Sequence, residues 1–220
     1  MKKTGWIRLF ILAGIALTGF SETVYQDNFD GDGKQPLVGT VPDISTDGAA
    51  WIGSDQGAQW MSNGRMESAE NQSCYVLLPF TPFAGKVYRL DVDVARIGTT
   101  HRFDAGFLSK EVPSGGSFTD VAGLASPWVR LQSNGEVWAM VSKSGGPGQL
   151  SKVNAARTHT LQIVLDTTGE SWTAEWTLDG KSGVRHEYKK NPEIHYVGFG
   201  RFRQGTFHVS RLALTVTDTE

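Results

Sequence analysis

Apolar and polar residues alternate with a period of two along most of this 220-residue chain, and this alternation constrains the fold more than any other feature. It is clearest in the segments 86–95, 158–166 and 171–178. In the last of these, Trp172 and Trp176 fall on one face, and hydroxyl or carboxylate side chains fall on the other. Half-buried antiparallel strands produce this pattern, whereas no segment after residue 21 has the 3.6-residue period of an amphipathic helix. The alternation therefore predicts an all-β protein.

Clusters of glycine, asparagine, aspartate and serine separate the alternating segments, for example at 133–135, 144–148 and 179–180. Such residues favour tight turns. Many short strands joined by frequent turns are typical of a two-sheet antiparallel sandwich of the jelly-roll type. The segments 31–50 and 110–125 are the least regular, and we expect them to be long loops bordering a ligand-binding face.

The first twenty-one residues have the pattern of a secretory signal peptide. An apolar run, Leu9–Leu17, follows three basic residues, which are Lys2, Lys3 and Arg8. The run is too short to span a membrane. We expect cleavage before Glu22, with cleavage after Gly19 as the alternative. Residues 22–220 are then a single β-sandwich domain that is exported, either to a periplasm or out of the cell.

Charge and cysteine content narrow the possible partners. The chain has 21 basic and 23 acidic residues, for a net charge of −2, and loss of the signal peptide makes it more acidic. A protein of this charge has no basic footprint for nucleic acid, so we expect no nucleic-acid partner. Cys74 is the only cysteine, so no internal disulfide can form. Its position in the strand-like segment 73–80 predicts a buried, unreactive thiol.

The segment 126–141 contains the clearest candidate binding site. Two strand-like runs flank the residues 133–135, and a three-residue loop with Gly135 in the left-handed conformation would close them into a hairpin. That register places four candidate ligand-binding side chains on the face away from the core: Trp128, Arg130, Gln132 and Trp138. Indole rings stack on the C–H face of a sugar, while guanidinium and amide groups bind hydroxyls or a carboxylate. Two alternatives stay open: a loop that covers this face, which would make the tryptophans ordinary packing, or a two-residue turn that shifts the register.

Carboxylates at the start of the domain predict a structural calcium site. Asp27, Asp30 and Asp32 supply hard oxygen ligands within one short segment, and Asp218 would join them if the first and last strands pair. The spacing does not match an EF-hand loop. The alternative is a solvated Asp-Gly turn that holds no metal.

Three short segments resemble the concanavalin A-like lectin and glucanase superfamily, which includes laminin-G-like domains. They are Asp27–Asp30, Ala84–Leu90 and Tyr196–Gly200. The last belongs to two strand-like runs around the turn at 203–205, where Gly198 and Gly200 leave room for a neighbouring backbone or a large ring. The resemblance implies a jelly-roll sandwich, a polysaccharide or glycan partner and, as in some such domains, a structural Ca²⁺ near the termini.

Known catalytic patterns of this superfamily are missing from the sequence. Its glucanases carry Glu-x-Asp-x-x-Glu or Glu-x-Asp-x-Glu on one strand, and this chain has neither. Asp91 and Asp93 alternate on a strand, and we interpret them as a solvated outer face. The segment Glu193–Tyr196 resembles the Gln-Ile-His strand of jelly-roll polysaccharide lyases, except that Glu replaces Gln and no Tyr-x-Lys strand follows.

We therefore predict a secreted, lectin-like, non-catalytic carbohydrate-binding protein. A polysaccharide lyase or glycoside hydrolase with a divergent active site is the first alternative. A cell-surface adhesion or assembly module, with another protein as its partner, is the second alternative.

Overall fold

The computed structural model of the chain describes residues 20–31, 33–53, 59–61, 64–68, 73–97, 102–109, 118–121, 126–142, 145–202 and 206–218. Most of the predicted signal peptide lies outside these ranges. The first strand, β1 (Ser21–Asp27), begins at the predicted end of that peptide.

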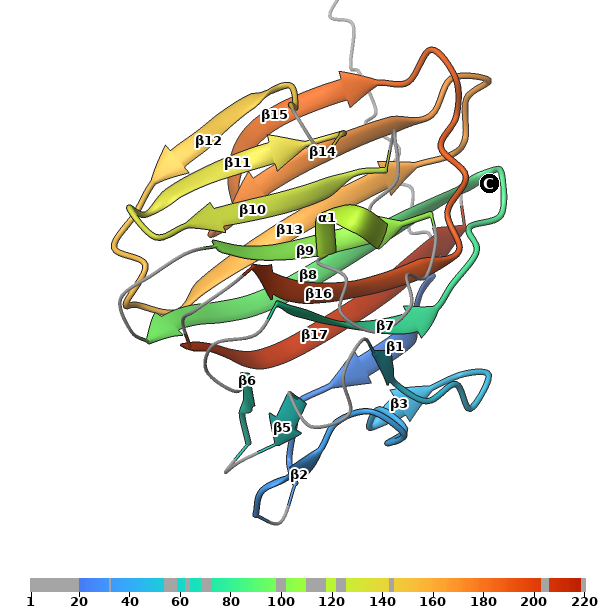
Figure 1. Ribbon diagram of the computed structural model, residues 1–220. Helices are drawn as coiled ribbons and strands as arrows, with labels where there is room; N and C mark the ends of the chain where they lie inside the picture. The colour runs from blue at the N-terminus through green and yellow to red at the C-terminus, as the bar shows by residue number, and fades with distance from the viewer. Residues whose placement is uncertain are drawn as a thin grey trace, which may run out of the picture.

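Two antiparallel sheets pack face to face in the described part of the chain (Figure 1). The larger sheet has the strand order β15-β14-β13-β8-β17-β6-β5-β2, with β1 paired to β17 and β3 paired to β1. Besides β1, its strands are β2 (Gln35–Pro36), β3 (Ile44–Ser45), β5 (Gln59–Met61), β6 (Met66–Ser68), β8 (Lys86–Ile97), β13 (His159–Asp166), β14 (Thr173–Leu178), β15 (Lys181–Glu187) and β17 (Thr206–Asp218).

The smaller sheet has the strand order β12-β11-β10-β9-β16-β7-β4. Its strands are β4 (Ile52–Gly53), β7 (Cys74–Pro79), β9 (Arg102–Leu108), β10 (Trp128–Gln132), β11 (Glu136–Met140), β12 (Gly148–Lys152) and β16 (Tyr196–Phe202). One short helix, α1 (Phe118–Val121), lies between β9 and β10 along the described chain. The predicted all-β, two-sheet antiparallel sandwich is confirmed.

The two longest strands, β8 and β17, pair along their length at the centre of the larger sheet, with an irregularity between Val209 and Arg211. The alternation predicted for 86–95 is confirmed in β8: Leu90 and Val92 are buried in the core, and Arg89 is exposed on the other side. A strand with this pattern is stable only where its apolar face is covered. In the sandwich, the other sheet covers the apolar face of β8.

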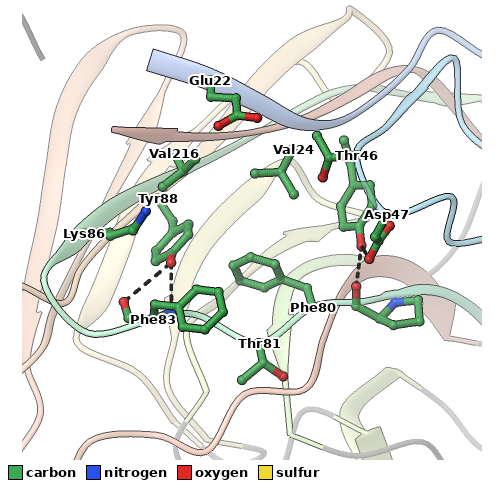
Figure 2. A pocket seen from close by; sticks show the side chains of 12 residues that line it. Glu22, Val24, Thr46, Asp47, Phe80, Thr81, Phe83, Lys86, Tyr88 and Val216 are labelled. Carbon is green, nitrogen blue, oxygen red and sulfur yellow. Dashed lines mark hydrogen bonds between the residues drawn. The ribbon is translucent and has the colours of Figure 1, made fainter. Parts of the chain in front are cut away.

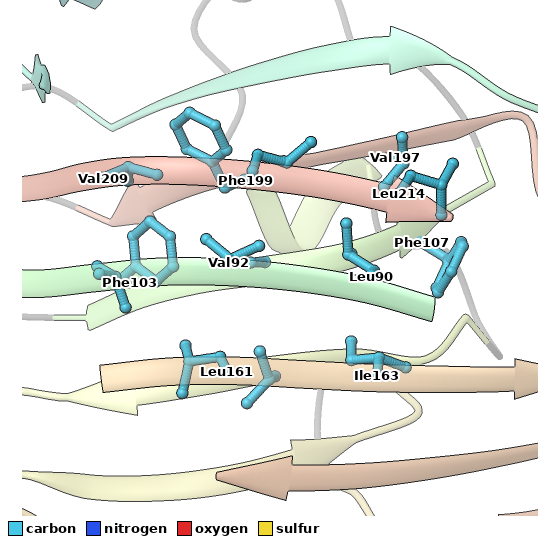
Figure 3. Packing of buried hydrophobic residues seen from close by; sticks show 14 of the residues in the cluster. Leu90, Val92, Phe103, Phe107, Leu161, Ile163, Val197, Phe199, Val209 and Leu214 are labelled. Carbon is cyan, nitrogen blue, oxygen red and sulfur yellow. The ribbon is translucent and has the colours of Figure 1, made fainter. Parts of the chain in front are cut away.

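Aliphatic and aromatic side chains together fill the space between the sheets (Figure 3). The ring of Phe199 in β16 lies 5.9 Å from that of Phe103 in β9 and 5.6 Å from that of Trp51. A buried hydrogen bond also joins the two sheets, because Nε1 of Trp176 in β14 donates to the backbone oxygen of Trp128 in β10 at 2.9 Å. Tryptophan packs well in a core when its N–H finds such a partner.

Glycines in β16 let other segments approach the smaller sheet closely. A Cβ atom on Gly198 would collide with the backbone oxygen of Val76 in β7. A Cβ atom on Gly200 would lie 3.1 Å from Cβ of Phe118 in α1. The prediction that these glycines make room for a backbone or a ring is confirmed, and the result is that α1 contacts both β16 and β9.

The thiol of Cys74 is buried in β7, as predicted. Within the described residues, the structure contains no helix that is both long and apolar enough to cross a membrane.

Candidate functional site

The hairpin of β10 and β11 has the register predicted from the sequence. Trp128 lies opposite Met140, and Arg130 lies opposite Trp138. Gly135 has a φ of 83°, and its N–H donates to the backbone oxygen of Gln132 at 3.0 Å. The three-residue loop with a left-handed glycine is therefore present, and the two-residue turn is excluded.

The face of the smaller sheet that is turned away from the core, called the outer face below, carries the candidate site. In the ladder between β9 and β10, Asp104 lies opposite Arg130, and Arg102 lies opposite Gln132. In the ladder between β10 and β11, Arg130 lies opposite Trp138. Asp104, Arg130 and Trp138 therefore form one row across three neighbouring strands, and this row is the centre of the site.

A buried carboxylate anchors the row. Asp104 is fully buried, and its two oxygens contact Nε of Arg130 at 2.9 Å and Nε of Arg102 at 3.3 Å. Burial raises the pKa of Asp104 above the ordinary value of an aspartate, and the two guanidinium groups partly oppose this rise. Sequence reasoning missed Asp104, although the alternation of Arg102 and Asp104 with apolar residues in β9 is a signal that could have placed it on this face.

Trp128 does not have the sugar-stacking role predicted for it. Its side chain is fully buried, and its ring centre lies 5.8 Å from that of Phe118 in α1. The guanidinium carbon of Arg130 lies 4.7 Å from the centre of the Trp128 ring. Part of the outer face is therefore covered by the segment between β9 and β10, which is one of the alternatives considered above. The indole supports the Arg130 guanidinium through a cation–π contact and is not available to stack on a ligand.

Arg130, Gln132 and Trp138 are only partly buried, so these three predicted residues keep surface that a ligand can reach. Nε1 of Trp138 donates to Oε2 of Glu136 at 3.3 Å, which helps to orient the indole. Glu136 is a polar neighbour that belongs to the same site. The arrangement offers one aromatic face together with fixed hydrogen-bond donors and acceptors.

The predicted metal ligands Asp27 and Asp30 line, with Asp43, a hollow of about 440 Å³. Asp27 is buried: its Oδ2 accepts a hydrogen bond from Nε1 of Trp51 at 2.7 Å, and its Oδ1 accepts one from the N–H of Phe29 at 2.7 Å. Burial is the main cause that raises the pKa of Asp27 to about 6, and the charges of Asp43 and Asp30 add to the rise.

The other two predicted metal ligands are not brought to this hollow. β1 and β17 do pair, as the sequence prediction required, but Asp27 lies opposite Leu212. Asp218 is six positions farther along β17, roughly 20 Å away at the rise of an antiparallel strand, and it forms an ion pair with Lys86 at 2.8 Å. Asp32 lies outside the described residues. Within the described ranges, no group of three or more His, Cys, Asp or Glu side chains is placed to hold a metal ion.

The alternating carboxylates Asp91 and Asp93 lie on the far side of the larger sheet, away from the core. Oδ2 of Asp91 contacts Nε of Arg89 at 2.9 Å, and its Oδ1 accepts from Nε2 of Gln162 at 2.8 Å. Oδ1 of Asp93 accepts from the hydroxyl of Thr160 at 2.6 Å. The contacts with Gln162 and Thr160 tie β8 to β13, whereas Arg89 belongs to β8 itself. Asp91 is buried, so the expectation of a solvated face is wrong for this residue, because its partners cover it.

A second hollow, of about 490 Å³, lies between β1 and the connection from β7 to β8 (Figure 2). The rings of Phe80 and Tyr88 line it with their centres 5.1 Å apart, and Phe83, which is 72% exposed, also lines it. The surface of this hollow is largely apolar, and four aromatic residues contribute to it.

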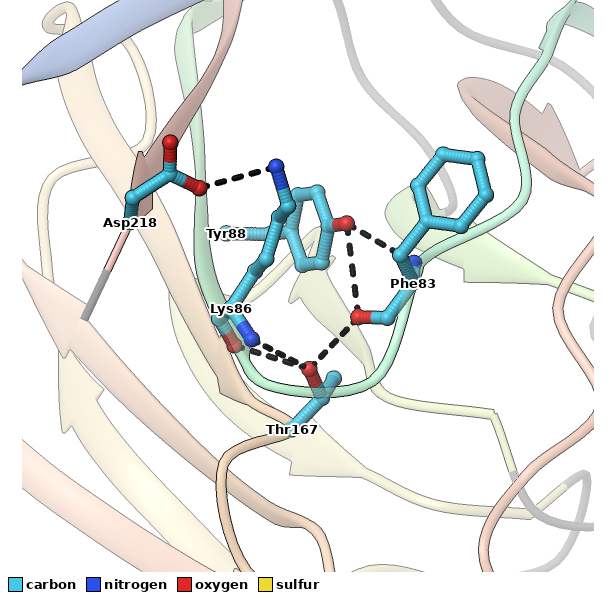
Figure 4. Close-up of polar contacts among 5 residues, drawn as sticks. All are labelled: Phe83, Lys86, Tyr88, Thr167 and Asp218. Carbon is cyan, nitrogen blue, oxygen red and sulfur yellow. Dashed lines mark hydrogen bonds and ion pairs between the residues drawn. The ribbon is translucent and has the colours of Figure 1, made fainter. Parts of the chain in front are cut away.

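Polar groups beside this second hollow are engaged with one another (Figure 4). The hydroxyl of Tyr88 accepts from the N–H of Phe83 at 2.8 Å, and the hydroxyl of Thr167 donates to the backbone oxygen of Phe83 at 2.7 Å. Lys86 is paired with Asp218. The outer face, which combines a partly exposed indole with a guanidinium held in place, is therefore the better candidate for sugar recognition.

Comparison with known structures identifies the fold of this chain. No protein-family model and no curated protein sequence matches the chain. An endo-1,3-β-glucanase from Streptomyces sioyaensis superposes with a TM-score of 0.59 and 14% identity, over 92% of this chain and 98% of the glucanase. The carbohydrate recognition domain of Emp47p superposes with a TM-score of 0.57 and 11% identity, over 91% of this chain and 98% of that domain.

A third structure, described with endo-acting O-glycanases of the human gut microbiota, gives a TM-score of 0.57 and 12% identity, over 90% of this chain and all of the other. Similarity at such low identity concerns the fold and not the activity. The shared architecture and the two antiparallel sheets show that this chain has the concanavalin A-like jelly-roll fold of lectins and glucanases.

Proposed function

We propose that this protein binds a polysaccharide or glycan on the outer face of its smaller sheet and does not cleave it. The row of Asp104, Arg130 and Trp138 carries the proposal, because it combines a partly exposed indole with a guanidinium group fixed by Asp104 and Trp128. The indole suits the apolar face of a sugar ring. The guanidinium and the amide of Gln132 suit the oxygens at its edge.

The comparisons support a glycan as the partner, since lectin domains and glycan-degrading enzymes both have this fold. The two carboxylates of the site, Asp104 and Glu136, favour binding over hydrolysis. A glycoside hydrolase needs one carboxyl group that gives a proton and a second that acts as base or nucleophile. Asp104 is held by two guanidinium groups, and Glu136 accepts a hydrogen bond from Trp138. A lyase or hydrolase is the alternative, and shortened product chains in a binding assay would favour it.

The sequence pattern of residues 1–21 supports export of the protein. A net charge of −2 gives no reason to propose a nucleic-acid partner. An assembly module that binds another protein is the remaining alternative, and capture of no glycan would favour it.

Replacement of Trp138 by alanine is expected to weaken glycan binding by about tenfold or more, because the exposed indole is the stacking surface. A screen of polysaccharides by affinity electrophoresis would identify a ligand, and calorimetry would then compare the variant with the wild type. Trp138→Phe keeps an aromatic face and should retain most of the affinity.

Phe83→Ala is the matched control for this experiment, because Phe83 is an exposed aromatic residue that lies outside the site. It should bind like the wild type. Equal binding by Trp138→Ala and the wild type, with both proteins folded, would remove the outer face from the proposal.

Measurement of the melting temperature tests the predicted calcium site. If Asp27 and Asp30 bind Ca²⁺, the melting temperature should rise with calcium relative to EDTA, and Asp30→Asn should abolish the rise. Asp27 has a pKa of about 6, so a bound proton must leave before calcium binds below that pH. The rise should therefore be larger at pH 7.5 than at pH 5. Identical melting curves in calcium and EDTA at pH 7.5 would contradict the site.

A further inference from the structure

We propose that the outer face recognises an acidic glycan, and that Arg130 binds the anionic substituent of the sugar. This inference rests on the proposed carbohydrate-binding function and names the class of glycan. A carboxylate and a sulfate share the relevant chemistry, which is a compact group of negatively charged oxygens.

The first observation concerns the way in which Arg130 is held. Its Nε is bound to Oδ1 of Asp104 at 2.9 Å, and its guanidinium lies over the buried ring of Trp128, 4.7 Å from the ring centre. These two contacts fix the plane and the direction of the group. Because Asp104 binds at Nε, the terminal nitrogens are not used by this ion pair. A planar donor that is already oriented loses little conformational entropy when it binds an anion.

The second observation is an unused donor. Within the described residues, Nη2 of Arg130 is buried and has no hydrogen-bond partner. A buried donor without a partner is unfavourable, and more so when the group is charged. Bound oxygen atoms would remove this cost. The side chain of Arg130 is 12% exposed, so its remaining surface opens next to the partly exposed Trp138.

The charges around Arg130 favour an anion over a neutral sugar. Asp104, the carboxylate bound to Arg130, divides its oxygens between Arg130 and Arg102. Glu136 accepts from the indole of Trp138, and it lies opposite Lys152 in the ladder between β11 and β12. On this face, two guanidinium groups share the one carboxylate of Asp104, although the net charge of the whole chain is negative. Guanidinium groups bind carboxylates and sulfates through two parallel hydrogen bonds, which hydroxyl groups cannot match in strength.

The experiment compares acidic polysaccharides with neutral partners that have the same backbone. Polygalacturonate, whose anionic groups are carboxylates, is paired with its fully methyl-esterified form, and kappa-carrageenan, whose anionic groups are sulfates, is paired with desulfated carrageenan. Calorimetry on the purified protein at 50 mM salt is expected to show at least tenfold tighter binding to the acidic member of one pair. The pair that responds distinguishes a carboxylate from a sulfate. Binding of that member should weaken as salt is raised to 200 mM.

Arg130→Lys provides the residue-level test, because it keeps the positive charge and removes the planar fork. The preference for the acidic member is expected to fall at least tenfold. Arg185→Lys, the same substitution at an exposed residue of β15 in the other sheet, should leave the preference unchanged. Circular dichroism and thermal melting check that both variants are folded. If Arg130→Lys does not fold, the matched polymer pairs and the salt series on the wild type still decide the question.

Equal affinity for the acidic and neutral members would overturn the inference and leave the carbohydrate-binding function standing. The inference would also be overturned if folded Arg130→Lys kept the full preference for the acidic member. Arg130 would then serve only to hold Asp104. Absence of binding to every member of both pairs and to the wider polysaccharide panel would overturn the inference and the proposed function together.

Discussion

Replacement of Asp104 by asparagine is expected to lower the free energy of unfolding by about 3–5 kcal/mol. Asp104 is fully buried and is the shared partner of Arg102 and Arg130, whose side chains are 25% and 12% exposed. Asparagine has nearly the same shape but carries no charge. The substitution therefore leaves two largely buried guanidinium groups without the carboxylate that compensates them. A loss of this size would lower the melting temperature of a chain of this length by roughly 6–20 °C.

Urea unfolding followed by tryptophan fluorescence would measure the effect on Asp104→Asn. Asp218→Asn is the matched control, because Asp218 is also ion-paired but is 71% exposed, and solvent screens its pair with Lys86. The control should unfold like the wild type. A loss of less than about 1 kcal/mol in Asp104→Asn would mean that the buried ion pairs do not hold the outer face together.

Phe199→Ala is expected to cost about 3–5 kcal/mol of unfolding free energy, because it removes a fully enclosed ring from the core. Phe199 is 1% exposed and contacts the rings of Phe103 (Figure 3), Trp51 and Phe29, which come from different parts of the chain. The surrounding strands are fixed by their ladders to β7 and β9, so they cannot collapse fully into the space that the ring leaves. The cost therefore includes a cavity as well as the lost transfer of the ring from water.

Phe83→Ala serves as the control for this core substitution, since it deletes the same ring from a position that is 72% exposed. Its unfolding free energy should stay close to that of the wild type. Phe199→Leu should fall between Phe199→Ala and the wild type, because leucine refills part of the space. Similar losses in Phe199→Ala and Phe83→Ala would show that the ring cluster around Phe199 does not contribute the expected packing energy.

The candidate site depends on the packing of α1 against the outer face and on the buried carboxylate of Asp104. Gly200 of β16 allows Phe118 to pack on the outer face, and Phe118 in turn covers Trp128, over which Arg130 lies. Asp104 fixes the other side of the same guanidinium. The partly exposed residues of the site, Arg130 and Trp138, are therefore held from below by residues that a ligand does not touch. Such support is what allows a small number of polar groups to recognise a ligand.

Local patterns in the sequence determined the fold class and the β10–β11 hairpin. Alternation identifies a strand and its buried face because successive side chains point to opposite sides. Gly135 determines the register of the hairpin because a three-residue loop with a left-handed glycine permits a single pairing of its two strands. These features depend on neighbours within a few residues. They could therefore be predicted without knowledge of the rest of the chain.

Only the tertiary structure decided which polar groups meet and which tryptophan stays accessible. Trp128 and Trp138 share a face by alternation, but α1 covers Trp128 and leaves Trp138 partly exposed. Asp104 and Arg130 meet because β9 and β10, separated by the segment that contains α1, pair in one particular register. The same kind of register places Asp218 far from Asp27, although their strands pair as predicted. Contacts between segments far apart in the chain depend on how all the strands pack together, and no local pattern specifies that packing.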